Sequence, residues 1–165
     1  MTEEYISGYL ESVSRVKDIL TPHVGGTNQF FSIEKDKQKS LTENILRFIN
    51  NNKDYYLQFG NEEKFKSDLE KIELKQIDSW EENFQKLIEN WTCDKILSEK
   101  FGKNGYYLSE YLIRFLLADF FKNKNVKLYK MLPDWSTWHW GDQMSDEFIF
   151  EIDDKIYIMH FGESS

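Results

Sequence analysis

The spacing of hydrophobic residues changes along the chain and divides it into two regions. Up to about residue 122, apolar residues recur mainly every three or four positions, which places them on one face of a helix. From residue 126 onward they alternate with polar residues, as they do in a half-buried strand. We therefore expect an α+β fold, in which a mainly helical N-terminal two thirds packs on a small C-terminal antiparallel β-sheet.

Capping residues mark where the expected helices begin. Thr2 can cap the first helix, and Ser40 with Glu43 three residues later forms a capping box for the second. Pro22 and Gly102 are residue types that commonly follow a helix end. The expected helices lie at about residues 2–21, 40–50, 61–72 and 78–91, followed by a short turn of helix ending at 101–102 and an apolar helix at 106–122; residues 23–29 are expected as a loop, and 30–33 and 54–60 as short strands or extended connections.

The C-terminal segment predicts a β-hairpin with a tight turn at Asp153 and Asp154. A two-residue loop there places Glu147 opposite His160 on the paired strand. The other face of the hairpin should pack on the helices because it is entirely apolar: Phe148, Phe150, Ile152, Tyr157, Met159 and Phe161. The face that carries Glu147 and His160 mixes these residues with isoleucines, and we expect it to be half exposed.

The length of the chain indicates how many domains it forms, and its charge indicates which classes of partner it can bind. With 165 residues and 40% hydrophobic side chains, we expect residues 1–165 to form a single domain around a sizeable core. The chain has 21 basic and 29 acidic side chains, a net charge of -8. Such a surface repels phosphate backbones, so nucleic-acid binding is disfavoured. It suits the capture of a basic partner, and negative charge that serves solubility alone is the alternative.

Cys93 is the only cysteine, so no disulfide can form within the chain. A lone cysteine can act as a nucleophile with a histidine as base, but beside an amphipathic helix it is more commonly a small buried residue. The N-terminus lacks the basic and apolar regions of a signal peptide. The most apolar run, residues 106–121, is interrupted by charges and falls short of the ~20 apolar residues that a bilayer span needs. We expect a cytoplasmic protein without membrane contact, whose oligomeric state the sequence does not encode.

The familiar motifs of phosphate, dinucleotide and zinc enzymes are absent, so we assign no catalytic residue, metal or cofactor. One grouping is chemically competent. His139 and His160 with Glu147 or Asp142 could form an acid–base pair, and with Asp146 they could bind zinc. The structural alternative for Glu147 and His160 is a cross-strand ion pair on an exposed face. Enzymatic activity is left open and is not favoured.

The segment PDWSTWHWGDQMSDE, residues 133–147, places three tryptophans within six positions. Trp135, Trp138 and Trp140 do not share a helical spacing, so we expect an ordered loop between strands. The indoles can fold inward and anchor the loop, or one can stay exposed as a contact for a partner. We expect Trp138 or Trp140 to be buried and Trp135 to be partly exposed. Acidic residues surround the tryptophans: Asp134, Asp142, Asp146 and Glu147.

The small acidic chain without catalytic motifs, and its C-terminal hairpin FIFEIDDKIYIMHFGESS, resemble the immunity proteins that neutralise bacterial polymorphic toxins. The resemblance implies a cytoplasmic protein that binds a basic toxin domain and blocks its active site. These families are diverse, so no residue role is carried over. We expect a protein-binding inhibitor, with a small enzyme of an unrecognised family as the alternative. The residues expected to contact the partner are Asp134, Trp135, Trp138, Asp142 and Glu147.

Overall fold

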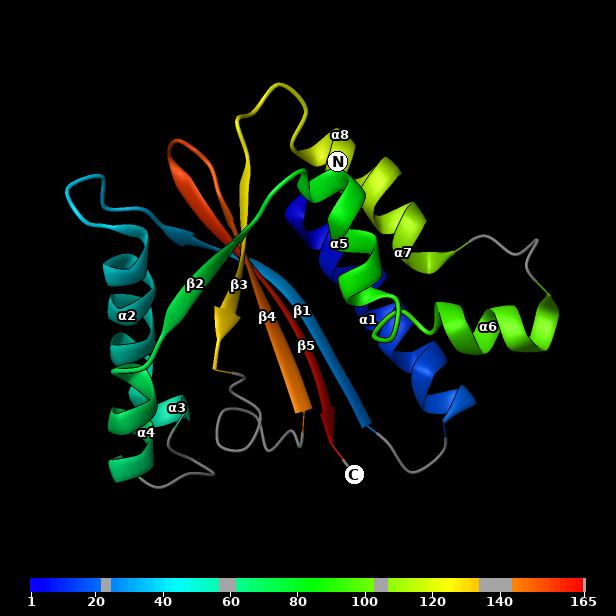
Figure 1. The fold of residues 1–165 in the computed structure, drawn as a ribbon, viewed down its shortest axis with the longest axis horizontal. Helices are drawn as coiled ribbons and strands as arrows, with labels where there is room; N and C mark the ends of the chain where they lie inside the picture. Colours follow the sequence, from blue (N-terminus) through cyan, green and yellow to red (C-terminus); the bar gives the residue numbers. More distant parts are fainter. Residues whose placement is uncertain (22–24, 57–61, 103–106, 134–143, 165) are drawn as a thin grey trace.

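The computed structural model describes residues 1–21, 25–56, 62–102, 107–133 and 144–164. In this part of the chain, helices pack on both faces of a five-stranded antiparallel sheet with the strand order β1-β5-β4-β3-β2 (Figure 1). The expected α+β fold is confirmed. The elements are, in chain order, α1 (Glu3–Leu20), β1 (Gly25–Glu34), α2 (Leu41–Asn51), α3 (Lys53–Tyr56), α4 (Glu62–Leu69), β2 (Glu73–Ile77), α5 (Trp80–Ile88), α6 (Asp94–Phe101), α7 (Leu108–Tyr111), the π-helical segment η2 (Leu112–Leu117), α8 (Ala118–Phe120), β3 (Lys127–Leu132), β4 (Met144–Glu151) and β5 (Lys155–Ser164).

The C-terminal hairpin has the register that the sequence predicts. β4 and β5 pair antiparallel with Glu147 opposite His160 and Phe150 opposite Tyr157. β5 also pairs with β1 along its whole length, from Gly25 to Glu34 of the latter strand. The hairpin is therefore interior to the sheet, and β1 and β2 are its two edge strands.

One face of the sheet carries an aromatic core. α1, α5 and η2 cover this face (Figure 1), and the apolar hairpin residues that the sequence assigned to it are all buried there. The Phe150 ring meets the rings of Phe30, Trp80 and Phe84 at centroid distances of 6.2, 5.8 and 5.6 Å, each close to edge-on. Edge-to-face contacts of this kind add to the free energy gained from apolar burial.

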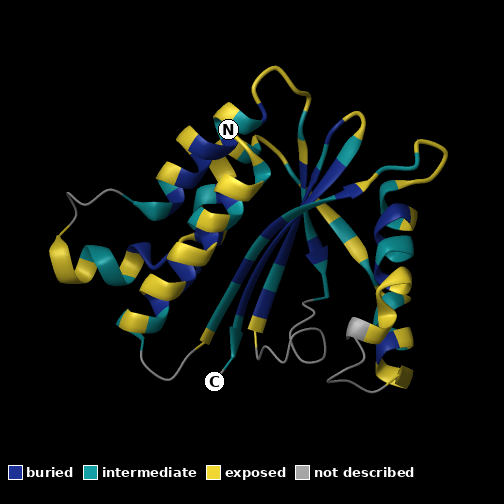
Figure 2. Cartoon of the chain, turned by 180° about the vertical axis from the view of Figure 1, so that it is seen from behind, coloured by how far each residue is buried: buried dark blue, intermediate teal, exposed yellow. Residues whose placement is uncertain are grey.

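The opposite face is covered by α2 and α4, and its core is aliphatic. Its buried residues are Ile33, Ile45, Ile49, Phe65, Met131, Ile149, Ile156 and Ile158. The prediction that this face is half exposed is wrong, because even Glu147 and His160 are buried on it. In Figure 2, most of the length of β4 and β5 has the buried colour. Alternation along a strand identifies its two faces but not whether a second layer of helices covers the face that includes polar residues.

Local capping sets the helix boundaries as expected. The Thr2 hydroxyl accepts a hydrogen bond from the Tyr5 N–H at the start of α1. Ser40 and Glu43 form the capping box of α2, with both reciprocal hydrogen bonds present. α6 ends at Gly102, whose φ of 82° suits a residue without a side chain. These ends depend on contacts within one turn of helix, so the sequence alone predicts them.

Three segments differ from the expectations. β1 already begins at Gly25, inside the segment that was expected to be a loop. Residues 54–56 belong to α3 and are helical, although their composition favours a strand. β2 was not predicted, and among the described strands it pairs with β3 alone. The composition of residues 25–29 of β1 and of β2 does not mark them as strands, so pairing with the neighbouring strand decides their conformation.

The expected apolar helix at 106–122 is present as α7, η2 and α8, within the described residues from 107 onward. Its middle part has π-helical hydrogen bonding. The Arg114 Nε lies 3.2 Å from Glu110 Oε1, as the spacing of four residues predicts. The helix buries an apolar side against the aromatic core through Leu112, Ile113, Leu116 and Leu117.

Candidate functional site

Most of the residues expected to contact a partner lie outside the described part of the chain. These residues are Asp134, Trp135, Trp138 and Asp142. Trp140 and His139, a residue of the enzyme alternative, also lie outside the described residues. Their roles therefore stay predictions. Glu147 is described, and its environment differs from the one expected of it.

Glu147 does not lie on an acidic rim at the surface. Its side chain is 3% exposed, and its Oε1 lies 2.7 Å from Nδ1 of His160, which is 2% exposed. The two residues face each other on β4 and β5, on the sheet face that α2 and α4 cover. The cross-strand pair was therefore predicted correctly, but its exposure was not. The prediction that Glu147 contacts a partner at the surface is wrong, because its side chain is buried and bonded to His160.

Among the described residues, the second carboxylate oxygen of Glu147 has no hydrogen-bond partner. The hydroxyl of Ser145, two residues earlier on the same strand, is also buried and has no partner in this part of the chain. Residues two apart on a strand point to the same face, so both oxygens lie on the side of the His160 ring. A carboxylate that is bonded through one oxygen only can still accept a proton or a hydrogen bond at the other.

Asp146 points to the opposite face of the sheet. Its Oδ2 accepts a hydrogen bond of 2.8 Å from Trp91 Nε1, and Lys130 Nζ lies 2.5 Å from its Oδ1. Because Asp146 and Glu147 are consecutive in a strand, Asp146 cannot join His160 in one metal site. This part of the zinc alternative is wrong. Within the described ranges, no group of three or more His, Cys, Asp or Glu side chains could hold a metal ion.

Cys93 is a buried residue just before α6 and is 1% exposed. Burial raises the pKa of its thiol to about 11. The thiol is therefore protonated at neutral pH, and a protonated thiol is a poor nucleophile. The structural interpretation of Cys93 fits this environment better than the catalytic one.

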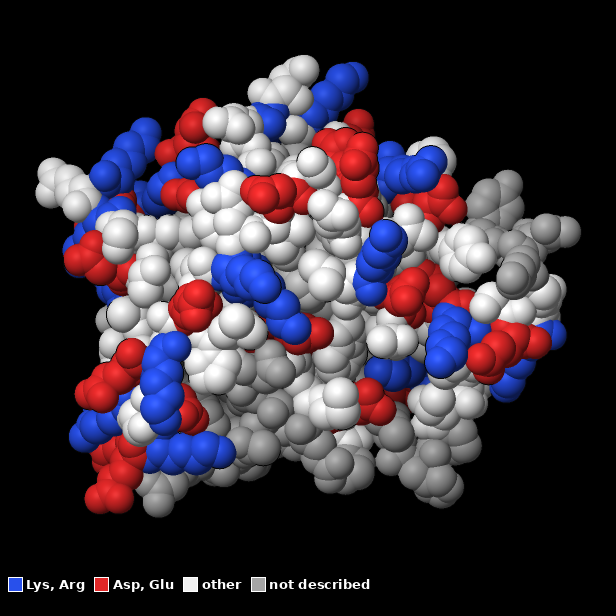
Figure 3. Space-filling model, in the orientation of Figure 1, with Lys and Arg blue, Asp and Glu red and all other residues white. Residues whose placement is uncertain are grey.

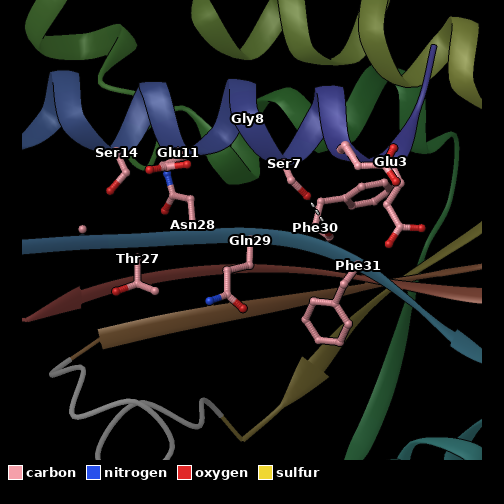
Figure 4. Close-up of a pocket in the computed structure, with 12 residues that line it drawn as sticks. Glu3, Ser7, Gly8, Glu11, Ser14, Thr27, Asn28, Gln29, Phe30 and Phe31 are labelled. Atoms are coloured by element: carbon pink, nitrogen blue, oxygen red, sulfur yellow. Dashed lines mark hydrogen bonds between the residues drawn. The ribbon is translucent and has the colours of Figure 1, made fainter.

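A groove of about 600 Å³ runs between α1 and the edge strand β1 (Figure 4). Asn28 and Phe30 of β1 point toward α1, whereas Thr27, Gln29 and Phe31 point away from it. The residues of α1 that line the groove lie on one side of this helix: Glu3, Glu4, Ser7, Gly8, Glu11 and Ser14. The β1 residues are 26–31. The sequence does not predict this groove, because nothing in it places the first helix beside residues 25–34, of which the first five were expected to be loop.

Side chains of α1 cap part of the free edge of β1. The Ser32 N–H donates to Glu3 Oε1 at 3.1 Å, and the Ser7 hydroxyl donates to the carbonyl of Phe30 at 2.5 Å. The Gly26 N–H donates to the Asp18 carboxylate at 2.8 Å. Such capping satisfies backbone groups that an edge strand otherwise presents to solvent.

The charge in the groove is negative. Three glutamates line it and, within the described residues, no lysine or arginine does. Hydrogen bonds from its own backbone N–H and from Thr2 lower the pKa of Glu4, so this carboxylate is ionised at neutral pH. Glu11 is paired with the exposed Arg15 at 2.5 Å. On the face seen in Figure 3, by contrast, acidic and basic side chains are interspersed.

No helix in the described residues is long and apolar enough to cross a membrane. The most apolar run of the sequence, which forms α7, η2 and α8, packs its apolar side against the sheet.

Comparison with known proteins gives only a distant structural likeness. No family model matches the sequence, and no curated protein does. Two crystal structures of citrus MAF1, in different space groups, are similar in fold at 17% sequence identity, with TM-scores of 0.49 and 0.46. The matches cover 95% and 94% of this chain and 99% of each MAF1 chain. A likeness of this degree carries no argument about what this protein does.

Proposed function

We propose that this protein is a cytoplasmic inhibitor that binds a basic protein domain and blocks it by occlusion, as immunity proteins block toxins. The observation that supports this proposal most is the acidic groove between α1 and β1, which is lined by three glutamates and, on the side away from α1, by the partly buried Phe31. A partner with lysine or arginine side chains would gain both charge complementarity and apolar contact there. The net charge of -8 would speed its approach.

The proposal is tested with the partner itself. The tagged protein is used to capture its partner from the source cell, and the partner is then purified and assayed with and without this protein. We expect inhibition at a one-to-one ratio and an association rate that falls steeply as salt is added, because attraction between opposite charges is screened. A captured partner whose activity is unchanged, or whose association ignores salt, contradicts the inhibitor proposal.

The tryptophan segment supplies an independent test of the same function. Trp135, Trp138, Asp134 and Asp142 stay proposed contacts. Trp135→Ala should weaken binding of the captured partner by about 2 kcal/mol, because exposed tryptophans are common hot spots of interfaces. Thermal unfolding of the variant serves as the control and should be unchanged. Unaltered affinity would remove this segment from the interface.

A second candidate function rests on the buried pair of Glu147 and His160. The free Oε2 of Glu147 makes this pair competent to move a proton if a substrate reaches it. Such an enzyme would use Glu147 to orient and polarise the imidazole. This is the small-enzyme alternative, restricted to the two residues that the structure brings together.

Glu147→Gln separates the two candidates. The amide keeps the shape of the side chain and can still hydrogen-bond to His160, but it removes the negative charge. An inhibitor should keep its affinity for the captured partner in this variant. Elemental analysis of the purified protein is a second measurement, since a stoichiometric zinc ion would favour the enzyme over the inhibitor.

A further inference from the structure

Gly8 lies in the middle of α1, where glycine is unfavourable. A glycine inside a helix costs about 1 kcal/mol relative to alanine, because it loses the most backbone freedom on folding. A Cβ atom built at Gly8 would meet nothing within 4 Å. Neither packing within the described chain nor a special backbone angle therefore requires glycine here.

Gly26, across the groove on β1, shows the opposite situation. A Cβ atom there would lie 2.5 Å from Ser14 Oγ and 3.4 Å from Asp18 Oδ1. Gly26 is needed for the close approach of α1 and β1. The absence of a side chain at Gly8 has no such internal cause, and its effect is to keep the wall of the groove low between Glu4 and Glu11.

Backbone groups at the edge of β1 lie beside the same groove. Side chains of α1 hydrogen-bond to backbone groups of Gly26, Phe30 and Ser32. These bonds show that the backbone groups of the three residues point away from β5. Alternate residues of a strand direct these groups to the same side, so the N–H and C=O of Asn28 also point away from β5. Neither is hydrogen-bonded to another described residue. An extended chain could bond to them as strands do at a sheet edge.

We propose that this groove takes an extended segment of the partner that carries lysine or arginine side chains. This inference rests on the proposed function and names the site and the chemistry of the partner. The backbone of the segment passes over Gly8 and bonds to β1 at Asn28. Its cations lie against Glu4 and Glu11 on the side of α1. Its apolar side chains alternate with the cations, so they lie on the other side and contact the partly buried Phe31. The charge of the groove selects a basic segment over an acidic one.

A synthetic peptide of roughly eight alternating lysines and valines, somewhat longer than an average strand, serves as the probe for the full-length protein. Binding is followed by the shifts of backbone amide signals in NMR spectra. We expect shifts concentrated in residues 3–11 and 26–32, weakened by salt. A peptide of alternating glutamate and valine should not bind. Equal binding of both peptides, shifts at β2 instead, or no binding of the lysine peptide overturns the proposal.

Gly8→Leu is the decisive variant. Leucine fills the low wall of the groove and is also a better helix former than glycine, so the protein should remain folded. We expect the affinity for the lysine peptide to fall about tenfold or more, equal to about 1.4 kcal/mol. Ser12→Leu, one turn further along α1 and outside the groove, is the matched control and should bind normally. An unchanged affinity of Gly8→Leu overturns the proposal.

Charge is tested separately. The double variant Glu4→Gln/Glu11→Gln should lower the affinity for the lysine peptide and flatten its salt dependence. Glu99→Gln on α6, an exposed acid outside the groove, is the control and should have no effect. If both variants behave alike, the overall charge of the protein rather than the groove attracts the peptide, and the proposal is wrong.

Binding of the captured natural partner separates this inference from the proposed function. A partner that is inhibited equally by wild-type protein and by Gly8→Leu leaves the inhibitor function standing and excludes the groove. Failure of every variant and of the wild type to inhibit any captured protein contradicts the function itself. A concentration-dependent dimer in sedimentation that Gly8→Leu abolishes would show that a second copy occupies the groove, and would also overturn the proposal.

Discussion

The two faces of the sheet are buried by different chemistry, although both belong to the same hairpin. The aromatic face is covered by α1, α5 and η2, and the rings of Phe30, Trp80 and Phe84 pack edge to face on Phe150. The aliphatic face is covered by α2 and α4, and it includes the buried pair of Glu147 and His160 among isoleucines. A polar residue on one face of a strand therefore does not predict that this face is exposed to solvent.

The buried pair also has a consequence for register. A slip of one residue between β4 and β5 would move Glu147 or His160 to the aromatic face and separate the two. Removing one charged partner leaves the other desolvated, which costs several kcal/mol. The pair therefore favours the native register, whereas the aromatic face stabilises the sheet mainly through buried area.

The largest expected effect comes from the aromatic face. Phe150→Ala should lower the free energy of unfolding by about 4 kcal/mol, because it removes a buried ring and leaves a cavity among four other rings. Urea denaturation measures the loss. Ile149→Val, the neighbouring residue on the aliphatic face, is the control and should cost only about 1 kcal/mol. Equal losses would mean that the two faces do not differ in this way.

The buried pair should give the next largest effect. Glu147→Leu should lower the free energy of unfolding by about 3 kcal/mol, because His160 loses its carboxylate in a buried position. In the double variant Glu147→Leu/His160→Leu the loss should be smaller than the sum of the two single losses. Additive losses in this cycle would show that the two side chains do not interact energetically.

An ion pair at the margin of the aromatic side should matter less. Lys17 Nζ lies 2.9 Å from Glu163 Oε2 and 4.7 Å from the centre of the Trp91 ring. Lys17→Met keeps most of the apolar stem and should lower the free energy of unfolding by about 1 kcal/mol, since Glu163 is 27% exposed and regains water. A loss as large as that of Glu147→Leu would remove the distinction between interior and marginal pairs.

The smallest expected effect has the opposite sign. Gly8→Ala should raise the free energy of unfolding by roughly 0.5–1 kcal/mol, because alanine favours the helix and has room there. Gly26→Ala should be destabilising, since its Cβ would overlap Ser14. Thermal unfolding compares the two variants. A destabilised Gly8→Ala would mean that the fold, and not a partner, requires glycine at this position.

Much of the fold could be predicted from local sequence. The caps at Thr2 and Ser40 and the register of the hairpin depend on residues close together in the chain, and all three are confirmed. β2 and the first half of β1 could not be predicted, since edge strands take their conformation from a neighbouring strand. The short helix α3 also depends on context, because its composition favours a strand.

The candidate site divides in the same way. The pairing of Glu147 with His160 follows from the turn at residues 153–154, so the sequence predicts it. The burial of that pair does not follow from the turn, because it depends on which other segments cover this face of the sheet, and α2 and α4, which lie more than seventy residues earlier in the chain, pack on it. The groove could not be predicted, because it forms only where α1 packs on β1. The open space at Gly8 is part of this groove and depends on the same packing.

Alternation, capping residues and turn length by themselves determined the longer helices of this protein and how its last two strands pair, and composition determined that its charge is negative. These properties are set by neighbours within a few residues and by composition. Only the tertiary structure decided that both faces of the sheet are covered and that an acidic groove opens at its edge. A residue becomes buried when segments far apart in the chain contact each other. The pattern of one segment does not say which other segment will cover it.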